Sequence, residues 1–235
     1  MKNRLICTLL ISAGLVSHAV GEERSRDPDY WYLTGSAGVL FSPKLGGTDL
    51  VLSKTQQAIT IPGEFAIAGK QAFGFTLGRH FERDYDAATE RKHPTRIELE
   101  YWGGDIQRDG FKAGVLDLPL DDTIEARAIF LNGAVQLWSG DSSSFWLGAG
   151  IGDSSVKMPR VADSSCECLY AAEGRGIAYR LKLNYEHAIG DSSAWFVDLG
   201  HVWLPAAETS RAQPAYSGHG KLKTAELRLG LRIAF

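Results

Sequence analysis

The sequence predicts an all-β fold: an eight-stranded antiparallel up-and-down transmembrane β-barrel with four long extracellular loops. Three observations predict it. Apolar residues recur with a period of two along eight segments, the N-terminus has the pattern of an export signal, and the connections between the eight segments alternate between short and long. No stretch after that signal is long and apolar enough for a membrane helix, so a span must be built from strands.

The N-terminus has the three parts of a signal peptide. Lys2 and Arg4 form a basic start, an apolar run covers residues 5–16, and small residues flank the expected cleavage position after Ala19. The alternative is a membrane anchor, but the apolar run is shorter than the roughly 20 residues that a helix needs to cross a bilayer. We therefore expect export.

Three segments follow from that signal. Residues 1–19 are expected to be the cleaved signal peptide, 20–29 a short periplasmic segment, and 30–235 the barrel. Loss of the signal peptide removes two basic residues and no acidic one, which leaves the chain more acidic than its overall net charge of −3. An acidic chain lacks the basic footprint of a nucleic-acid binder, so we expect no nucleic-acid partner.

Two cysteines remain beyond the signal peptide, Cys166 and Cys168. An exported protein permits disulfides, so they form either a small local disulfide or two free thiols in a loop. The Cys-Glu-Cys sequence lacks the two-residue spacer and the second ligand pair of a zinc site. We expect neither a metal ion nor another cofactor.

The C-terminal segment shows the alternation most clearly. From Ala225 to Phe235 every odd position is apolar, and the even positions are charged or small. The segments 177–186 and 96–101 repeat this pattern, which indicates strands with one apolar and one polar face. Five further strands, whose second face is largely small, are predicted at Trp31–Phe41, Ala72–Phe81, about Ile129–Trp138, Phe145–Gly152 and Trp195–Trp203.

The connections define two ends. Residues 139–143 and 188–193 are short and both contain Gly-Asp-Ser-Ser, a turn-forming sequence. The segments expected as long loops are 42–69, 104–124, 153–174 and 205–222. The connection at 82–94 is longer than this alternation predicts.

Aromatic residues indicate which face meets lipid. Seven of the eight strands carry an aromatic residue at the end beside a short turn or a terminus, and these ends share one side of the barrel. Such a ring is favoured at a membrane–water interface, whereas the core of a soluble barrel has no reason to collect aromatics at one rim. The seven residues are Trp31, Phe81, Trp138, Phe145, Tyr185, Trp195 and Phe235.

The polar face carries charges of both signs. On the lipid face, each Arg or Lys at mid-depth costs about 2–4 kcal/mol, so in a membrane these charges must point into the lumen. On a soluble barrel the same residues would form a solvated surface. The predicted luminal charge network consists of Glu98, Glu100, Arg180, Lys182, Glu186, Asp198, Glu226, Arg228 and Arg232.

The last eight residues resemble the signal that directs barrels to the outer membrane. Arg228, Gly230, Ile233 and the terminal Phe235 occupy its polar, glycine, apolar and final aromatic positions. This resemblance implies recognition by the barrel-assembly machinery and a place in the outer membrane of a Gram-negative-type bacterium, among its lipids and lipopolysaccharide.

Several strands together are similar to those of the opacity and surface-antigen family of eight-stranded, OmpA-like outer-membrane proteins. The similar segments are AFGFTLGRHF, RIELEYW, IFLNGAVQLW, FWLGAGIG, GIAYRLKLNYEHAI, AWFVDLGHVWL and TAELRLGLRIAF. The resemblance covers most of the membrane-spanning part and none of the long loops. It implies a surface antigen with roles in adhesion and the cell envelope, and it brings no catalytic motif.

Three functions are compatible with the sequence. The first is a non-enzymatic surface barrel, structural, adhesive or antigenic, that acts through its loops on an extracellular ligand. The second is a small-solute channel, through the lumen or sideways into the membrane. The third is an enzyme that modifies outer-leaflet lipid, but His201 has Trp203 two residues on, where a deacylase of this kind has serine. We expect no enzyme.

The second loop is acidic at its far end. Asp117, Asp121, Asp122 and Glu125 are either solvated or bind divalent cations among lipopolysaccharide phosphates, and we favour the solvated alternative.

Deletion of Phe235 should impair assembly more than it destabilises barrels already formed, since this residue ends the assembly signal. Heat-modifiable migration on gels should show unfolded protein accumulating in the periplasm. A normal yield of folded protein in the outer membrane would contradict this prediction.

Overall fold

The computed structural model describes residues 29–46, 48–52, 59–82, 94–163, 166–169, 171–209 and 215–235. The predicted signal peptide, most of segment 20–29 and most of the 82–94 connection lie outside these residues. No helix in the described part of the chain is long and apolar enough to cross a membrane.

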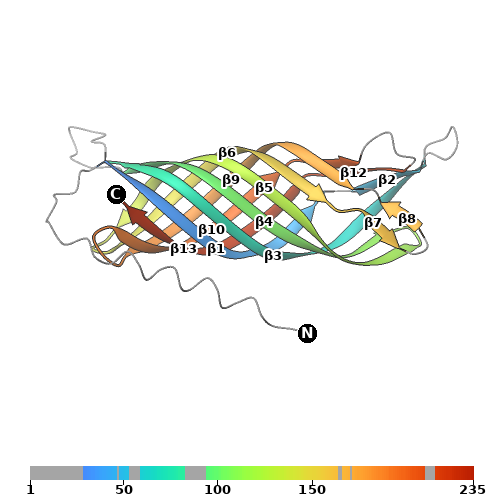
Figure 1. Cartoon of the computed structure of the whole chain (residues 1–235), viewed down its shortest axis with the longest axis horizontal. Helices are drawn as coiled ribbons and strands as arrows, with labels where there is room; N and C mark the ends of the chain where they lie inside the picture. Colours follow the sequence, from blue (N-terminus) through green and yellow to red (C-terminus); the bar gives the residue numbers. More distant parts are fainter. Residues whose placement is uncertain are drawn as a thin grey trace.

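Eight long antiparallel strands form a closed ring (Figure 1). Around the ring each strand pairs with the next, and β1 pairs with both β3 and β13, which closes the sheet. Over the stretch where β1 pairs with both neighbours, closure leaves no unpaired edge, as a barrel in lipid requires. The strands are β1 (Tyr30–Leu45), β3 (Ile59–Phe81), β4 (Thr95–Ala113), β5 (Leu116–Ser139), β6 (Ser143–Met158), β9 (Ala172–Ala188), β10 (Ser193–Leu204) and β13 (Leu222–Ala234).

Each predicted strand coincides with part of one of these eight, to within one residue, so the predicted eight-stranded antiparallel barrel is confirmed. The predicted loops need correction, because much of their length is strand. Segment 104–124 is almost wholly β4 and β5, joined by a tight turn at Gly114 and Val115. The alternation in this segment has the opposite sign, because its apolar residues point inward: Ile106 and Ile124 are fully buried.

Short strands extend the wall at the end with the long connections, called here the loop end (Figure 1). The strands β11, β12 and β2 pair in sequence and join β9 to β3, beyond the points where β1, β10 and β13 stop. The strands β7 and β8 form a separate pair. These short strands are β2 (Thr48–Leu52), β7 (Val161–Asp163), β8 (Cys166–Leu169), β11 (Ala207–Thr209) and β12 (Ala215–His219).

The polarity of the wall reverses along the strands. In the first half of β4, Ile97 and Leu99 are each 54% exposed on the outer face, and charged residues alternate with them inside. In the second half, Trp102 and Ile106 are buried inside, and polar residues face outward. An apolar exterior suits lipid and an apolar interior suits a wall in water, so the reversal marks a membrane border.

The opposite end, called the turn end, has the two short turns. In the first turn Gly140 N donates to Ser143 O at 2.8 Å, and in the second Ile189 N donates to Ser193 O at 3.0 Å. Both Gly-Asp-Ser-Ser sequences therefore form tight turns between neighbouring strands, as predicted.

The aromatic residues of the turn end lie side by side. The ring centroids of Trp138 and Phe145 are 6.0 Å apart, those of Phe145 and Tyr185 5.0 Å, and those of Tyr185 and Trp195 5.4 Å. These contacts form a continuous row along the outside of β5, β6, β9 and β10. On β1 and β3, the guanidinium of Arg79 lies over the rings of Trp31 and Phe81, at 5.5 and 5.0 Å.

Leu229 lies midway along the outward apolar face of β13 and is 61% exposed. Leu229→Arg should place a cation among acyl chains and lower the free energy of unfolding by about 2–4 kcal/mol. Reversible urea unfolding in lipid vesicles would measure it. Val115→Arg, at the fully exposed β4–β5 turn, is the control and should change stability by less than about 0.5 kcal/mol. A cost below about 1 kcal/mol at Leu229 would contradict the assigned face.

Candidate functional site

The nine charged residues of the predicted network all lie on the inner face and are buried. They come from β4, β9, β10 and β13, where alternation sends every second side chain into the lumen. The structure adds Arg96 on β4, which sequence analysis placed on the polar face but not in the network. Five carboxylates and five cations therefore form this charged layer.

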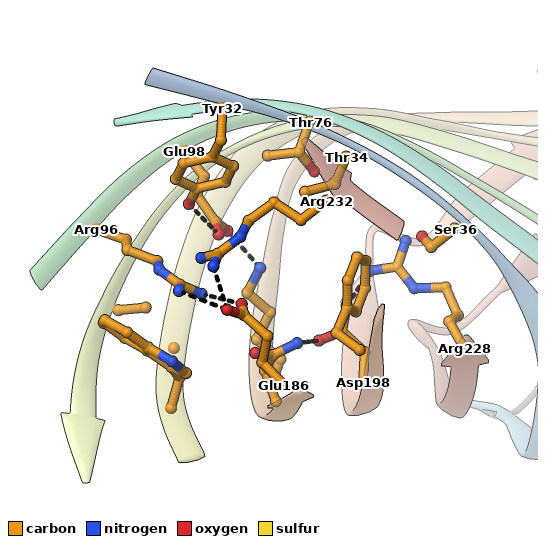
Figure 2. Close-up of a pocket in the computed structure, with 16 residues that line it drawn as sticks. Tyr32, Thr34, Ser36, Thr76, Arg96, Glu98, Glu186, Asp198, Arg228 and Arg232 are labelled. Carbon is orange, nitrogen blue, oxygen red and sulfur yellow. Dashed lines mark hydrogen bonds and ion pairs between the residues drawn. The ribbon is translucent and has the colours of Figure 1, made fainter. Parts of the chain in front are cut away.

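Near the turn end, Glu186 holds two arginines. Arg96 Nη1 donates to Glu186 Oε2 at 2.9 Å, and Arg232 forms an ion pair with the other oxygen. The Arg96 guanidinium also lies 3.6 Å from the centroid of the Trp146 ring, a cation–π contact. Figure 2 shows Arg96 and Arg232 converging on Glu186 from different sides of the lumen.

In the next layer Glu98 links β4 to β1 and β9. It accepts a hydrogen bond from Tyr32 Oη at 2.7 Å (Figure 2). It also forms an ion pair with Lys182. Alternation places Glu98 and Arg228 on the same inner face, but the structure pairs Arg228 with Glu100 and Asp198 instead.

The centre of the network is Glu100. It forms an ion pair with Arg180, and it accepts hydrogen bonds from Arg228 Nη2 at 2.8 Å and Asn132 Nδ2 at 2.9 Å. Since its donors come from β5, β9 and β13, this one carboxylate ties together strands on several sides of the barrel.

Arg228 and Arg180 extend the network to two more carboxylates. Arg228 Nη2 lies 3.1 Å from Asp198 Oδ2, and Arg180 Nη2 lies 2.5 Å from Glu226 Oε1. Removing these charges from water is costly, and only close pairing with opposite charges offsets that cost. Each of the five carboxylates forms an ion pair with at least one cation of the network, which meets this requirement.

Small residues on the inner face make room for this network. A Cβ atom added to Gly74 would lie 2.0 Å from Arg228 Nη1, and one added to Gly150 would lie 2.0 Å from Asn132 Oδ1. The guanidinium and the amide therefore occupy the space of absent side chains on neighbouring strands. The small residues predicted on the inner face of the narrow barrel therefore leave room for the larger polar side chains of neighbouring strands.

An apolar cluster fills the lumen on the loop side of the charges. Trp102 joins the two layers: its Nε1 donates to Glu226 Oε2 at 2.7 Å, and its ring packs edge-on against Phe130. The buried members of this cluster, called here the luminal apolar cluster, are Leu40, Ala72, Trp102, Ile106, Ile124, Ala126, Ala128, Phe130, Val156, Met158, Ala172, Ala178, Val202, Leu204, Ala207 and Leu222.

The charged layer leaves little open space. The cavity within the charged layer, lined by Tyr32, Arg96, Arg228 and Arg232 among others, has a volume of about 20 Å³ (Figure 2). That volume corresponds to about one water molecule. In this conformation the charged layer does not admit a solute.

The acidic residues of the second predicted loop are paired along the β4–β5 extension. Arg108 donates to both oxygens of Asp122, at 2.5 and 2.6 Å, and Lys112 lies 3.1 Å from Asp117. Asp121 accepts from a glutamine, and Glu125 lies 3.9 Å from Arg127. The described residues contain no cluster of three or more metal-ligating side chains.

The residues of the assembly signal lie on both faces of β13. Arg228 and Gly230 point inward, where Gly230 lies beneath the Phe196 ring. Ile233 and Phe235 point outward and are 49% and 69% exposed. Cys166 and Cys168 are in β8, and whether they form a disulfide lies outside the side chains that the structure describes.

The structure also brings together a serine and a histidine that sequence analysis did not connect. Ser143 Oγ lies 2.9 Å from His187 Nδ1 and 3.1 Å from Tyr185 Oη, at the turn end. Ser143 on β6 and His187 on β9 are direct cross-strand neighbours although they are 44 positions apart in the sequence, so only the strand register reveals the pair. Among the described residues, the His187 ring hydrogen-bonds to Ser143 alone.

The closed ring, the apolar exterior and the buried charges define a transmembrane β-barrel of eight strands. Comparison with solved structures places the fold among outer-membrane barrels. The chain is similar to the outer-membrane protein OprG from Pseudomonas aeruginosa, with a TM-score of 0.54, 11% identity, and 88% of this chain and 96% of that chain covered.

Two further barrels match with lower TM-scores. They are the outer-membrane protein AlkL, with a TM-score of 0.46, 13% identity and 93% and 95% of the two chains covered, and Neisserial surface protein A, with 0.43, 12%, 87% and 97%. No protein-family model and no curated protein sequence matches the chain.

The central ion pairs should be energetically coupled. Arg228→Met leaves Asp198 and Glu100 short of a cation, and Asp198→Asn leaves Arg228 short of an anion, so each change should destabilise the barrel, by up to about 3–5 kcal/mol. The loss of stability in the double variant should be clearly smaller than the sum of the losses in the two single variants. Urea unfolding in vesicles provides the free energies of unfolding of the unchanged protein, the two single variants and the double variant.

The exposed pair Lys112 and Asp117 is the control, because both side chains are more than 60% exposed. Its coupling energy should be within about 1 kcal/mol of zero. Equal coupling in the two cycles would show that the luminal pair is not formed in the membrane.

Proposed function

We propose that this protein is a non-enzymatic surface barrel of the outer membrane, structural, adhesive or antigenic, whose loop end projects from the cell and carries the binding surface. The observation behind the proposal is the filled lumen. The charged layer and the luminal apolar cluster lie in series along the barrel and are both closely packed. A filled barrel suits a rigid support better than a conduit.

The loop end offers the surface that such a role needs. A small apolar core packs the β4–β5 extension against β3, and in it the ring centroids of Phe65 on β3 and Phe111 on β4 lie 4.7 Å apart. The bidentate pair of Arg108 and Asp122 fastens its two long strands together. This extension is therefore a rigid hairpin, and its tip at Val115 is fully exposed.

The proposal that the protein is not an enzyme rests on the histidines. On the outer face, the ring centroids of His201 and Trp203 lie 4.4 Å apart. The histidine therefore has a tryptophan beside it at the position where a deacylase would have a nucleophilic serine. The Ser143–His187 pair lacks an acid on the imidazole among the described residues, so it lacks the third group of a catalytic triad.

One observation favours a second candidate, a sideways path for small solutes. The β1–β3 ladder ends at Val39 and Gln71, and the β2–β3 ladder begins only at Thr48 and Gly63. Between the two ladders lies a cleft of about 530 Å³. Leu45 and Ile67 line the cleft and pack against the apolar clusters behind it, so passage requires these side chains to move.

Two measurements separate these candidates. An epitope tag inserted at Gly114 should be reached by antibody on intact cells, and a tag at Ser142 in the first turn should be reached only after the outer membrane is permeabilised. Labelling of Ser142 on intact cells would reverse the proposed orientation.

In planar bilayers the purified barrel should show no stable conductance steps, and vesicles containing it should take up a small apolar dye no faster than empty vesicles. Conductance would support a channel through the lumen. Dye uptake without conductance would support the sideways path and contradict the purely structural role.

A further inference from the structure

Three lysines meet on the outer face at the loop end of β1 and β13. Lys44 and Lys223 are direct cross-strand partners, and Lys223 is also paired with Trp203 on β10. Lys221 lies two residues before Lys223, immediately ahead of β13, and its carbonyl accepts from Gly46 N at 3.1 Å. Lys44, Lys221 and Lys223 are called here the lysine patch.

The lysine patch has no counter-charge within the described residues. All three side chains are exposed, and none forms an ion pair with a described carboxylate. Glu64 lines the same cleft as Lys44 but makes no ion pair with it. Like charges directly opposite each other on a sheet repel, so the Lys44–Lys223 pair destabilises the isolated barrel.

The other lysines on the described part of the outer surface have polar partners. Lys112 pairs with Asp117, Lys70 Nζ donates to Gln107 Oε1 at 3.2 Å, and Lys157 lies directly opposite two glutamates on its neighbouring strands. The lysine patch differs from them by this lack of a partner, which indicates an anion supplied from outside the chain.

The depth of the lysine patch identifies where that anion lies. On β1 the outward residues before Lys44 are Val39 and Phe41, 52% and 39% exposed, and on β13 the apolar outward face begins just after Lys223. Trp203 is paired with Tyr179 on β9 at this level. Tryptophan and tyrosine concentrate at the headgroup level of a membrane, so the lysines lie just above the acyl chains.

We propose that the lysine patch binds the phosphate groups of lipopolysaccharide in the outer leaflet. The phosphorylated sugars of this lipid supply closely spaced anionic charges at the headgroup level, and its acyl chains would run down the apolar face of β1 and β13. Binding would remove the repulsion between Lys44 and Lys223. The proposal rests on the outward orientation of the loop end.

The test compares two forms of one lipid. Lipid A carrying both phosphates and the same lipid stripped of phosphate are each titrated onto the refolded chain in uncharged detergent micelles, and binding is followed by native mass spectrometry. A lysine near an anionic surface contributes about a fivefold factor in affinity. The phosphorylated form should bind roughly a hundredfold more tightly, and this preference should fall as salt is raised.

The diagnostic variant replaces Lys44, Lys221 and Lys223 by Gln together and should lose most of the preference for phosphate. The matched control replaces Lys70, Lys112 and Lys157 by Gln, which removes the same charge from the same end, and it should keep the preference. Heat-modifiable gel migration verifies that both variants are folded, so a loss reports binding.

Three outcomes would overturn the proposal: equal binding of the two lipid forms by the unchanged protein, retention of the preference by the diagnostic variant, or an equal loss in both triple variants. Equally tight, equally lysine-dependent binding of phosphatidylglycerol would overturn the assignment to lipopolysaccharide. Micelles have no sidedness, so these results do not depend on orientation, which the epitope tags test separately.

Discussion

The ladder between β1 and β13 closes the sheet, and the rest of the structure depends on that closure. A bilayer interior has no water to bond to backbone groups, so an open sheet edge there is too costly. The register runs from Tyr32 opposite Ala234 to Leu45 opposite Leu222, and Phe235 N adds a bond to Trp31 O at 2.9 Å. The two ends of the chain sequence thus complete one wall.

Closure with eight strands makes the lumen narrow, and a narrow lumen dictates what fills it. Side chains that point inward from opposite walls must meet, so charges of one sign have to find the other sign across the barrel. Glu100 does so with Arg180 and Arg228, and Gly74 provides the space for the Arg228 guanidinium. In this barrel the luminal side chains must therefore fit the narrow space and pair with the opposite charge at the same time.

The reversal of polarity along the strands explains how one continuous wall can face lipid along one part of its length and water along the other. Near Leu99 the apolar face is outside and the lumen is charged, whereas near Ile106 the apolar face is inside. Trp102 lies between these regimes, with its indole nitrogen bonded to a glutamate of the charged layer. The wall therefore continues beyond the membrane border as an extension with its own core, which carries the surface proposed to act outside the cell.

Much of this protein could be predicted from its sequence, because alternation is a local property. One step along a strand changes the face, so the sequence alone predicted eight strands with Arg228 inside and Leu229 outside. The extent of the wall was missed at 104–124, because the same alternation there has the opposite sign, and only packing against Phe130 and its neighbours reveals it.

The partners of each charge were decided by the tertiary structure. Alternation shows that Arg228 enters the lumen, but the register and width of the barrel determine which carboxylate it meets, and these bring Glu100 and Asp198 to it in place of Glu98. The pairing of Lys44 with Lys223 has the same origin. Residues so distant in sequence become neighbours only when the sheet closes, because closure alone sets the distances across and around the barrel.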